Sequence, residues 1–292
     1  MAKTISEGFD TFLGWLVPLA TEHEKASSHK DSVFSCLNKN FECTRLFETG
    51  SFGNGTGIRH YSDTDYFASI PNGQLYSSSA YTLRKVKEAL QETFWNTDGI
   101  IVNTPAVMLP FGNYASESLE VTPCSFKGLT ETPLGEFQAY NIADGNDGWM
   151  LSSPGAHNAY VQKHDDRLNG KLKPLIRFIK AWKYYNNVPI SSFYLELRVT
   201  KYAEDETSII YDIDIKRVMK MLHDKGLASI QDPMNISGYV NPCASDSKKD
   251  DALSKLATGH GRSEKAYEER EKDIDKAFYW WDMFFNNEFP AR

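Results

Sequence analysis

Two aspartates, Asp63 and Asp65, end a glycine-rich stretch and carry side chains that can hold divalent cations. Apolar residues follow them directly, which is typical of a β-strand. Residues two apart on a strand face the same side, so both carboxylates can reach one pair of ions. Upstream, Gly50-Ser51 offers backbone N–H groups and a hydroxyl, unobstructed by a Cβ at the glycine, which suits a triphosphate. Together these groups predict metal-dependent chemistry on a nucleotide.

The order and spacing of these elements resemble a known signature. The chain reads Gly50-Ser51, then Gly55-Thr56-Gly57-Ile58, then Ser62-Asp63-Thr64-Asp65. This resembles the nucleotidyltransferase motif, and in detail that of the cGAS/DncV-like enzymes, the SMODS-type bacterial CD-NTases. The resemblance extends from about residue 41 to residue 251. It implies that the nucleotide is bound by Gly50, Ser51, Thr56 and Ser62, beside metal ligands at Asp63 and Asp65.

A two-metal site needs a third carboxylate on an adjacent strand. Residues 118–123 alternate between polar and apolar, so Leu119 and Val121 are expected in the core and Glu120 on the other side. The segment also resembles the third motif of the family, an acidic residue shortly before a proline. Glu117 is the rival candidate, but it falls on the opposite face of the strand from Glu120. We therefore predict that two Mg²⁺ (or Mn²⁺) ions are held by the catalytic residues Asp63, Asp65 and Glu120.

A basic helix face follows in the second half of the chain. Residues 172–185 place apolar side chains on one side at helical spacing and, on another, Lys173, Arg177, Lys180 and Tyr184. Such a basic face is usually only solvated, and Phe193 taken alone would be assigned to the core. However, this segment and the following Ser191-Ser192-Phe193 resemble the helical half of CD-NTases. The resemblance implies that Lys180 and Ser192 approach the donor phosphates and that Phe193 stacks on the base.

Two further Asp-x-Asp pairs are interpreted as structural. Asp212 and Asp214 precede an expected helix, where aspartates cap free N–H groups. Asp273 and Asp275 fall within another expected helix, where side chains two apart point away from each other. Neither pair therefore predicts a second metal site.

The amino-acid composition limits which nucleic-acid or membrane partners the protein is expected to bind. The formal net charge of −7 over 292 residues argues against a broad nucleic-acid surface. The four cysteines are far apart and lack zinc spacing, unlike the zinc-binding insertion of the family's animal relative, so we expect no long DNA activator. The apolar run at residues 12–20 lacks a basic leader and is too short to span a bilayer. We therefore expect a cytoplasmic protein without a membrane partner.

Hydrophobic periodicity predicts strands near residues 41–49, 63–70, 100–108, 119–123 and 137–142. Later segments are helical in pattern, namely residues 156–167, 171–185, 192–202, 213–225 and 252–281, with a surface loop at 244–251. With the resemblance, this predicts an α+β fold. A nucleotidyltransferase (polymerase-β-like) mixed-sheet core with N-terminal helices, at residues 1–155, would pack against a helical C-terminal domain at residues 156–292, with the active cleft between them.

The resemblance also implies a function. Such an enzyme joins NTPs into a cyclic di- or trinucleotide second messenger, which is made in anti-phage (CBASS) signalling and read by a separate effector protein. Two alternatives stay open. A linear oligonucleotide synthase, or an enzyme that transfers a nucleotidyl group to a protein or tRNA, would share the carboxylates. A catalytically silent nucleotide-binding partner would have lost one of them, whereas all three are present.

Overall fold

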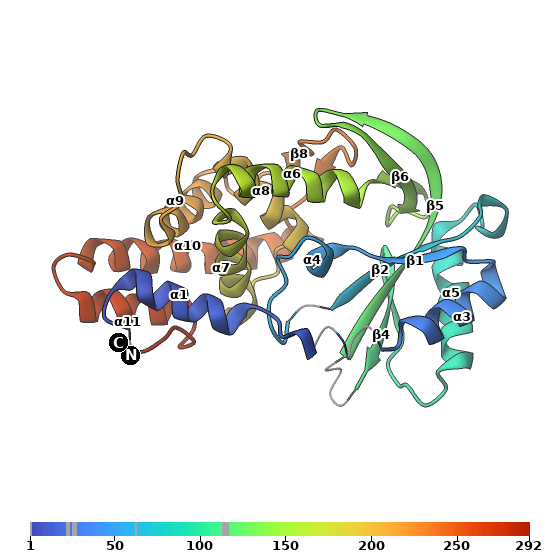
Figure 1. Cartoon of the computed structure of the whole chain (residues 1–292), viewed down its shortest axis with the longest axis horizontal. Coiled ribbons are helices and arrows are strands. Elements are labelled where there is room, and N and C mark those ends of the chain that lie inside the picture. Colours follow the sequence, from blue (N-terminus) through green and yellow to red (C-terminus); the bar gives the residue numbers. More distant parts are fainter. Residues whose placement is uncertain (1, 22–23, 25–27, 62, 113–116) are drawn as a thin grey trace. The chain divides into compact units, whose positions relative to one another are not determined.

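The computed structural model describes residues 2–21, 24, 28–61, 63–112 and 117–292. They form two compact units. The sheet unit comprises Pro18–Ala159 and Met234–Ser237, and the helical unit comprises Met1–Val17, Tyr160–Pro233 and Gly238–Arg292. Strands thus dominate the first half of the chain and helices the second (Figure 1), which confirms the predicted α+β class.

Within the described residues, seven strands form the main sheet: β1 (Arg45–Glu48), β2 (Thr64–Ser69), β3 (Ile101–Asn103), β4 (Ala106–Phe111), β5 (Glu117–Thr132), β6 (Gly135–Ala143) and β7 (Trp149–Ser152). The order is β1-β2-β5-β4-β3, with β6 paired to both β5 and β7. The β2–β5 pair is parallel, whereas the other pairs are antiparallel. Strand β5 is long because its first half pairs with β2 and β4, and its second half pairs with β6.

Two strand predictions need correction. The strand expected at residues 100–108 is a hairpin of β3 and β4 with Thr104 and Pro105 in its turn. Proline has no N–H to donate to a ladder, so it lies where the pairing is interrupted. Strand β7 was not predicted, and β5 continues well beyond the expected end at residue 123.

Helices α3 (Lys30–Phe41) and α5 (Ser79–Thr93) pack on one face of this sheet (Figure 1). Leu37 from α3 and Val86 from α5 are fully buried there against Leu119 and Val121 of β5. Helix α5 begins at a serine cap, because the Ser78 hydroxyl accepts a hydrogen bond from the next turn. The sheet unit also contains a single turn of helix, α4 (Gly50–Gly53), and a 3₁₀ turn, η1 (Asn72–Gln74).

The helical unit contains α1 (Ile5–Leu16), α7 (Leu172–Tyr185), α8 (Ser192–Ala203), α9 (Tyr211–Asp224), α10 (Asp246–Glu269), α11 (Ile274–Phe284) and the short pair β8 (Ile230–Gln231) and β9 (Tyr239–Val240). Helix α6 (Pro154–Arg167) contains the boundary between the units. Helix α1 was expected in the N-terminal core, but it belongs to the helical unit. Its buried Phe9 and Phe12 lie 5.1 and 6.0 Å, centroid to centroid, from Phe178 of α7.

Two predictions for the C-terminal helices are wrong. Residues 246–251 are helical rather than a loop, because Ser245 caps α10 by accepting a hydrogen bond from the Lys248 N–H. The helix then ends at Glu269 instead of continuing to residue 281. Asp273 caps a separate helix, α11, by accepting from the Lys276 N–H. This Asp-x-Asp pair therefore lies at a helix N-terminus, where the aspartate has a structural role.

Cys36, Cys43, Cys124 and Cys243 are all free thiols, and the first three are buried. In the part of the chain that the structure describes, no helix combines the length and apolar character needed to cross a membrane.

Candidate active site

Strands β2 and β5 bring two of the predicted carboxylates side by side. In this parallel pair, Asp65 is the register partner of Glu120. Asp63 immediately precedes β2, two residues from Asp65, so it belongs to the same face of the sheet. The adjacent residues Tyr66 and Val121 lie in the core on the opposite face, beneath α3 and α5. The face with the carboxylates is thus the one that these two helices leave uncovered.

Asp63 and Glu120 both have raised pKa values, mainly because they are buried. Burial raises the pKa of Asp63, and the nearby Ser118 hydroxyl offsets part of this rise. Burial also raises the pKa of Glu120; Asn103 Nδ2, which donates to Glu120 Oε1 over 2.8 Å, opposes the rise, and the charge of Asp63 adds to it. A cation beside two buried carboxylates would favour their charged forms.

Gly50 lies directly against Asp65. Its φ is +60°, and a Cβ built on it would overlap the Asp65 carboxylate and lie 2.8 Å from the Asp65 Cβ. Glycine is therefore required at this position by both backbone conformation and space. The Thr49 N–H donates to the Asp65 carbonyl over 2.8 Å, which ties the turn to β2. The Gly50-Ser51 turn is thus held at a predicted metal ligand.

Three other predicted nucleotide contacts lie in or near this loop. Ser51 is half-buried in α4. Thr56 is fully buried, and its N–H donates to the Ser51 carbonyl over 2.8 Å, so it shapes the loop. Ser62 lies outside the described residues. The predicted contact of Thr56 with nucleotide is therefore not supported by the position of its side chain.

Glu117, the rival to Glu120, lies on the other face of β5. The β4–β5 register is regular from Glu117 to Val121, so residues three apart face opposite sides. His29 Nε2 lies 3.1 Å from Glu117 Oε2, and the His29 ring stacks on Phe111 at 4.0 Å between centroids. Glu117 is thus engaged with the helix-covered side of the sheet.

The donor set suits Mg²⁺ or Mn²⁺, which prefer carboxylate oxygens. Within the described ranges, no three His, Cys, Asp or Glu side chains are close enough together to hold an ion. Asp65 and Glu120 share a register position, and their side chains can rotate about χ1 toward one cation. Ser118 Oγ is buried beside Asp63 and makes no hydrogen bond of standard geometry to a described residue. The Ser118 hydroxyl can therefore bind a polar group at the site. The residues therefore fit the predicted ions.

The remaining predicted contacts lie in the helical unit. Lys180 of α7 is fully buried, and its Nζ donates to Glu196 Oε1 of α8 over 2.9 Å. Ser192 is half-buried and accepts a hydrogen bond from Lys183 Nζ over 2.7 Å. Phe193 follows it with 37% of its surface exposed. Ser192 and Phe193 are thus accessible to a ligand. Helical spacing predicted Lys180 on an exposed basic face, but its side chain is buried.

Sequence reasoning missed three residues at these sites: Asn103, Ser118 and Lys183. Asn103 meets Glu120 only because β3 and β5 flank β4, which the sequence does not reveal. Ser118 shares the strand face of Glu120, and the polar–apolar alternation would have found it. Lys183 lies one helical turn after Lys180, so helical spacing alone does not separate the two lysines.

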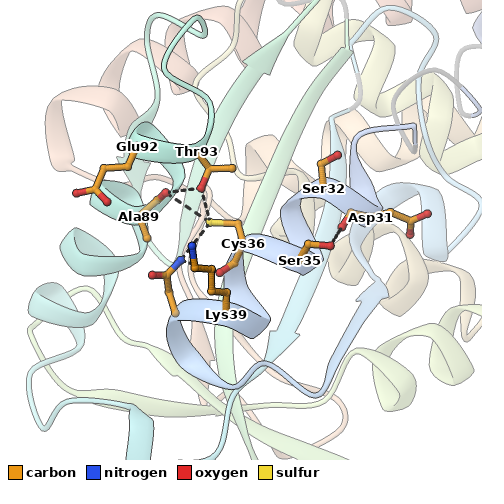
Figure 2. Close-up of a pocket in the computed structure, with 9 residues that line it drawn as sticks. Asp31, Ser32, Ser35, Cys36, Lys39, Ala89, Glu92 and Thr93 are labelled. Atoms are coloured by element: carbon orange, nitrogen blue, oxygen red, sulfur yellow. Dashed lines mark hydrogen bonds between the residues drawn. The ribbon is translucent and has the colours of Figure 1, made fainter.

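A surface hollow of about 700 Å³ lies between α3 and α5. Figure 2 shows the hydrogen bonds that join Cys36, Ala89 and Thr93 at the wall of this hollow. The Thr93 hydroxyl donates to Cys36 Sγ over 3.0 Å. The hollow is on the helix-covered side of the sheet, opposite the carboxylates, so we do not assign the reaction to it.

Comparison with known proteins identifies the fold. The chain superposes on CdnC of E. coli MS115-1, solved with HORMA-deltaN, with a TM-score of 0.73, covering 98% of both chains at 16% identity. The chain has the CD-NTase fold. The Elizabethkingia meningoseptica CdnE cyclic dinucleotide synthase gives a TM-score of 0.63 at 18% identity, over 85% of this chain and 96% of that one. No protein-family model and no curated protein matches the sequence.

A third CD-NTase structure gives a similar result. The Vibrio cholerae DncV cyclic AMP-GMP synthase, in complex with a linear intermediate, matches with a TM-score of 0.62 at 16% identity, over 85% of this chain and 70% of that one. At these identities the likeness establishes the fold alone.

Proposed function

We propose that the chain is a metal-dependent nucleotidyltransferase that joins NTPs into a cyclic di- or trinucleotide second messenger for anti-phage (CBASS) signalling. The observation that carries the proposal is the register of Asp65 and Glu120 on parallel strands, with Asp63 on the same face. Gly50, held against Asp65, adds a phosphate-binding turn at the same place. Solved proteins with this fold include cyclic nucleotide synthases, which supports the class of product.

In this proposal, Asp63 and Asp65 would hold two Mg²⁺ or Mn²⁺ ions, and Glu120 would be a further ligand to one of them. Bound there, the ions would stabilise charge on the phosphates and lower the pKa of a ribose hydroxyl. The N–H groups and hydroxyl of Gly50-Ser51 orient the triphosphate. Asn103 orients Glu120 through its hydrogen bond.

The bond changes follow from the substrates. The ribose oxygen of one nucleotide forms a bond to the α-phosphorus of a second NTP, and the bond from that phosphorus to the bridging oxygen breaks. Pyrophosphate leaves, and the hydroxyl proton passes to solvent. A second transfer of the same kind closes the ring. A separate effector protein would then read the product.

The alternative is a linear product, or transfer of the nucleotidyl group to a protein or tRNA. To decide, the full chain is incubated with the four NTPs and Mg²⁺, one NTP labelled at a time, and the products are analysed by mass spectrometry. A ring survives phosphatase and a 3′-exonuclease, whereas a linear product loses its terminal phosphates and is degraded. A mass increase of the protein itself would instead indicate self-nucleotidylation.

A further inference from the structure

A cluster of one lysine and two hydroxyls lies where α7 meets α8 in the helical unit. Lys183 Nζ donates to Ser192 Oγ over 2.7 Å. The Tyr184 hydroxyl lies 3.1 Å from the same oxygen, and either of these two hydroxyls can donate to the other. Lys183 Nζ also lies 4.4 Å from the centroid of the Tyr184 ring. The cluster thus brings the Lys183 ammonium and two hydroxyls together at one place.

Lys183 is unusual because its charge is partly buried without a counter-ion. Among the described residues, no carboxylate lies within ion-pair distance of its Nζ, and Ser192 Oγ is its hydrogen-bond acceptor. Burial, together with the positive charge of Lys180, lowers the pKa of Lys183 to about 8. Buried charges in proteins are normally paired. A lysine ammonium has three N–H donors, and this one uses a single donor within the described protein.

Lys180 differs in each of these respects. Its side chain is fully buried, and Glu196 Oε1 accepts a hydrogen bond from its Nζ over 2.9 Å. Its charge is therefore compensated within the helical unit. A phosphate that approached α7 would meet the uncompensated charge of Lys183 before that of Lys180.

We propose that Lys183, with the hydroxyls of Ser192 and Tyr184, is the phosphate-binding lysine of the helical unit, in place of Lys180. The identity of the ligand as a nucleoside triphosphate rests on the proposed function. Lys183 donates to the phosphate oxygens as a point charge, and the hydroxyls donate beside it. Phe193, exposed and next to Ser192 in the chain, then offers a ring face to the base.

The test is binding of inorganic tripolyphosphate to the full chain in the presence of EDTA, measured by calorimetry. Tripolyphosphate has no base, and without metal its binding does not depend on the carboxylates. We expect Lys183→Met to lower its affinity about tenfold or more, as the loss of a charged hydrogen bond to phosphate predicts. Lys183→Arg should recover most of the affinity. Unchanged binding by Lys183→Met, or no detectable binding by the wild type, would overturn the inference.

Two controls make this result interpretable. Lys173→Met removes the same charge from the same helix, and since Lys173 bonds to Gln162 outside the cluster, tripolyphosphate binding should stay within about twofold of wild type. The melting temperature of Lys183→Met should be equal or higher, because the variant removes an uncompensated buried charge. A large fall would assign Lys183 a structural role and contradict the inference.

Failure of the inference and failure of the proposed function are distinguishable. If Lys183→Met binds tripolyphosphate normally while the wild type forms oligonucleotides, the inference is wrong and the function stands. If binding depends on Lys183 while no NTP is converted under any metal condition, the phosphate site stands and the proposed function is wrong.

Discussion

Asp65 and Glu120 are register partners on the parallel strands β2 and β5. This pairing places two carboxylates from distant parts of the chain on one face, whereas Glu117 faces the other side and lies 3.1 Å from His29. The two glutamates, three residues apart, therefore provide a matched pair of variants.

Glu120→Gln should lower the rate of nucleotide transfer by about a hundredfold or more, because it removes a charged metal ligand and keeps the size of the side chain. Glu117→Gln should leave the rate within about twofold of wild type, since Glu117 does not reach that face. Initial rates at saturating NTP and Mg²⁺ measure both. A larger loss in Glu117→Gln than in Glu120→Gln would contradict the assigned strand faces.

Gly50→Ala should greatly reduce activity. The new Cβ would overlap the Asp65 carboxylate, and φ at this position is +60°, so the turn or the carboxylate must move. Gly53→Ala is the control in the same short helix, because a Cβ there meets its nearest atom, the Glu48 carbonyl oxygen, at an ordinary 3.5 Å. Comparing kcat and melting temperature for both variants tests the close approach. Equal activities would show that Gly50 has room for a side chain.

The strand face on which each carboxylate lies follows from sequence, because the alternation of side chains along a strand is local. Side chains alternate along a strand, so the spacing of Asp63 and Asp65, and the position of Glu120 between Leu119 and Val121, determine their faces without knowledge of the rest of the fold. Asn103 could not be predicted in the same way. Its contact with Glu120 depends on the order of strands that are distant in sequence.

Helical spacing predicted less about the nucleotide contacts expected on α7 and α8. A period of 3.6 residues shows which side chains share a face of α7, but it does not show what packs on that face. Glu196 of α8 compensates the charge of Lys180, and this contact is tertiary. The position of α1 in the helical unit is also tertiary, since it depends on aromatic contacts such as that between Phe9 and Trp281.

The Lys180–Glu196 pair should be structural. Lys180→Met leaves a buried carboxylate without its partner, which should cost about 3–5 kcal/mol of folding stability. Lys180→Met combined with Glu196→Leu should recover much of that loss, because no unpaired charge remains. Urea unfolding of the two single variants and the double variant gives the coupling energy. Additive losses would show that the two side chains do not form a pair.

Phosphate binding should depend on pH through Lys183. Its pKa is lowered from the ordinary 10.5 to about 8 by burial and by Lys180, so the charged form is complete well below pH 8 and is lost as the pH rises through this value. Glu196 neutralises Lys180 nearby, and the hydroxyls of Ser192 and Tyr184 are the other polar groups at the cluster. Tripolyphosphate affinity in EDTA should therefore fall between pH 7 and pH 9.5.

Lys183→Arg provides the control, because a guanidinium stays charged over this whole range. Its affinity profile should be nearly flat. A wild-type profile as flat as that of Lys183→Arg would show that the lysine does not titrate in this window.

The most direct test of the account is release of pyrophosphate from a mixture of the four NTPs in Mg²⁺ by the wild type and by Asp63→Asn combined with Asp65→Asn. Both side chains keep their size and lose their charge, so the fold should remain while the metal ligands are lost. We predict metal-dependent release by the wild type and less than about one per cent of that rate in the double variant. Comparable release by a folded double variant would contradict the central claim.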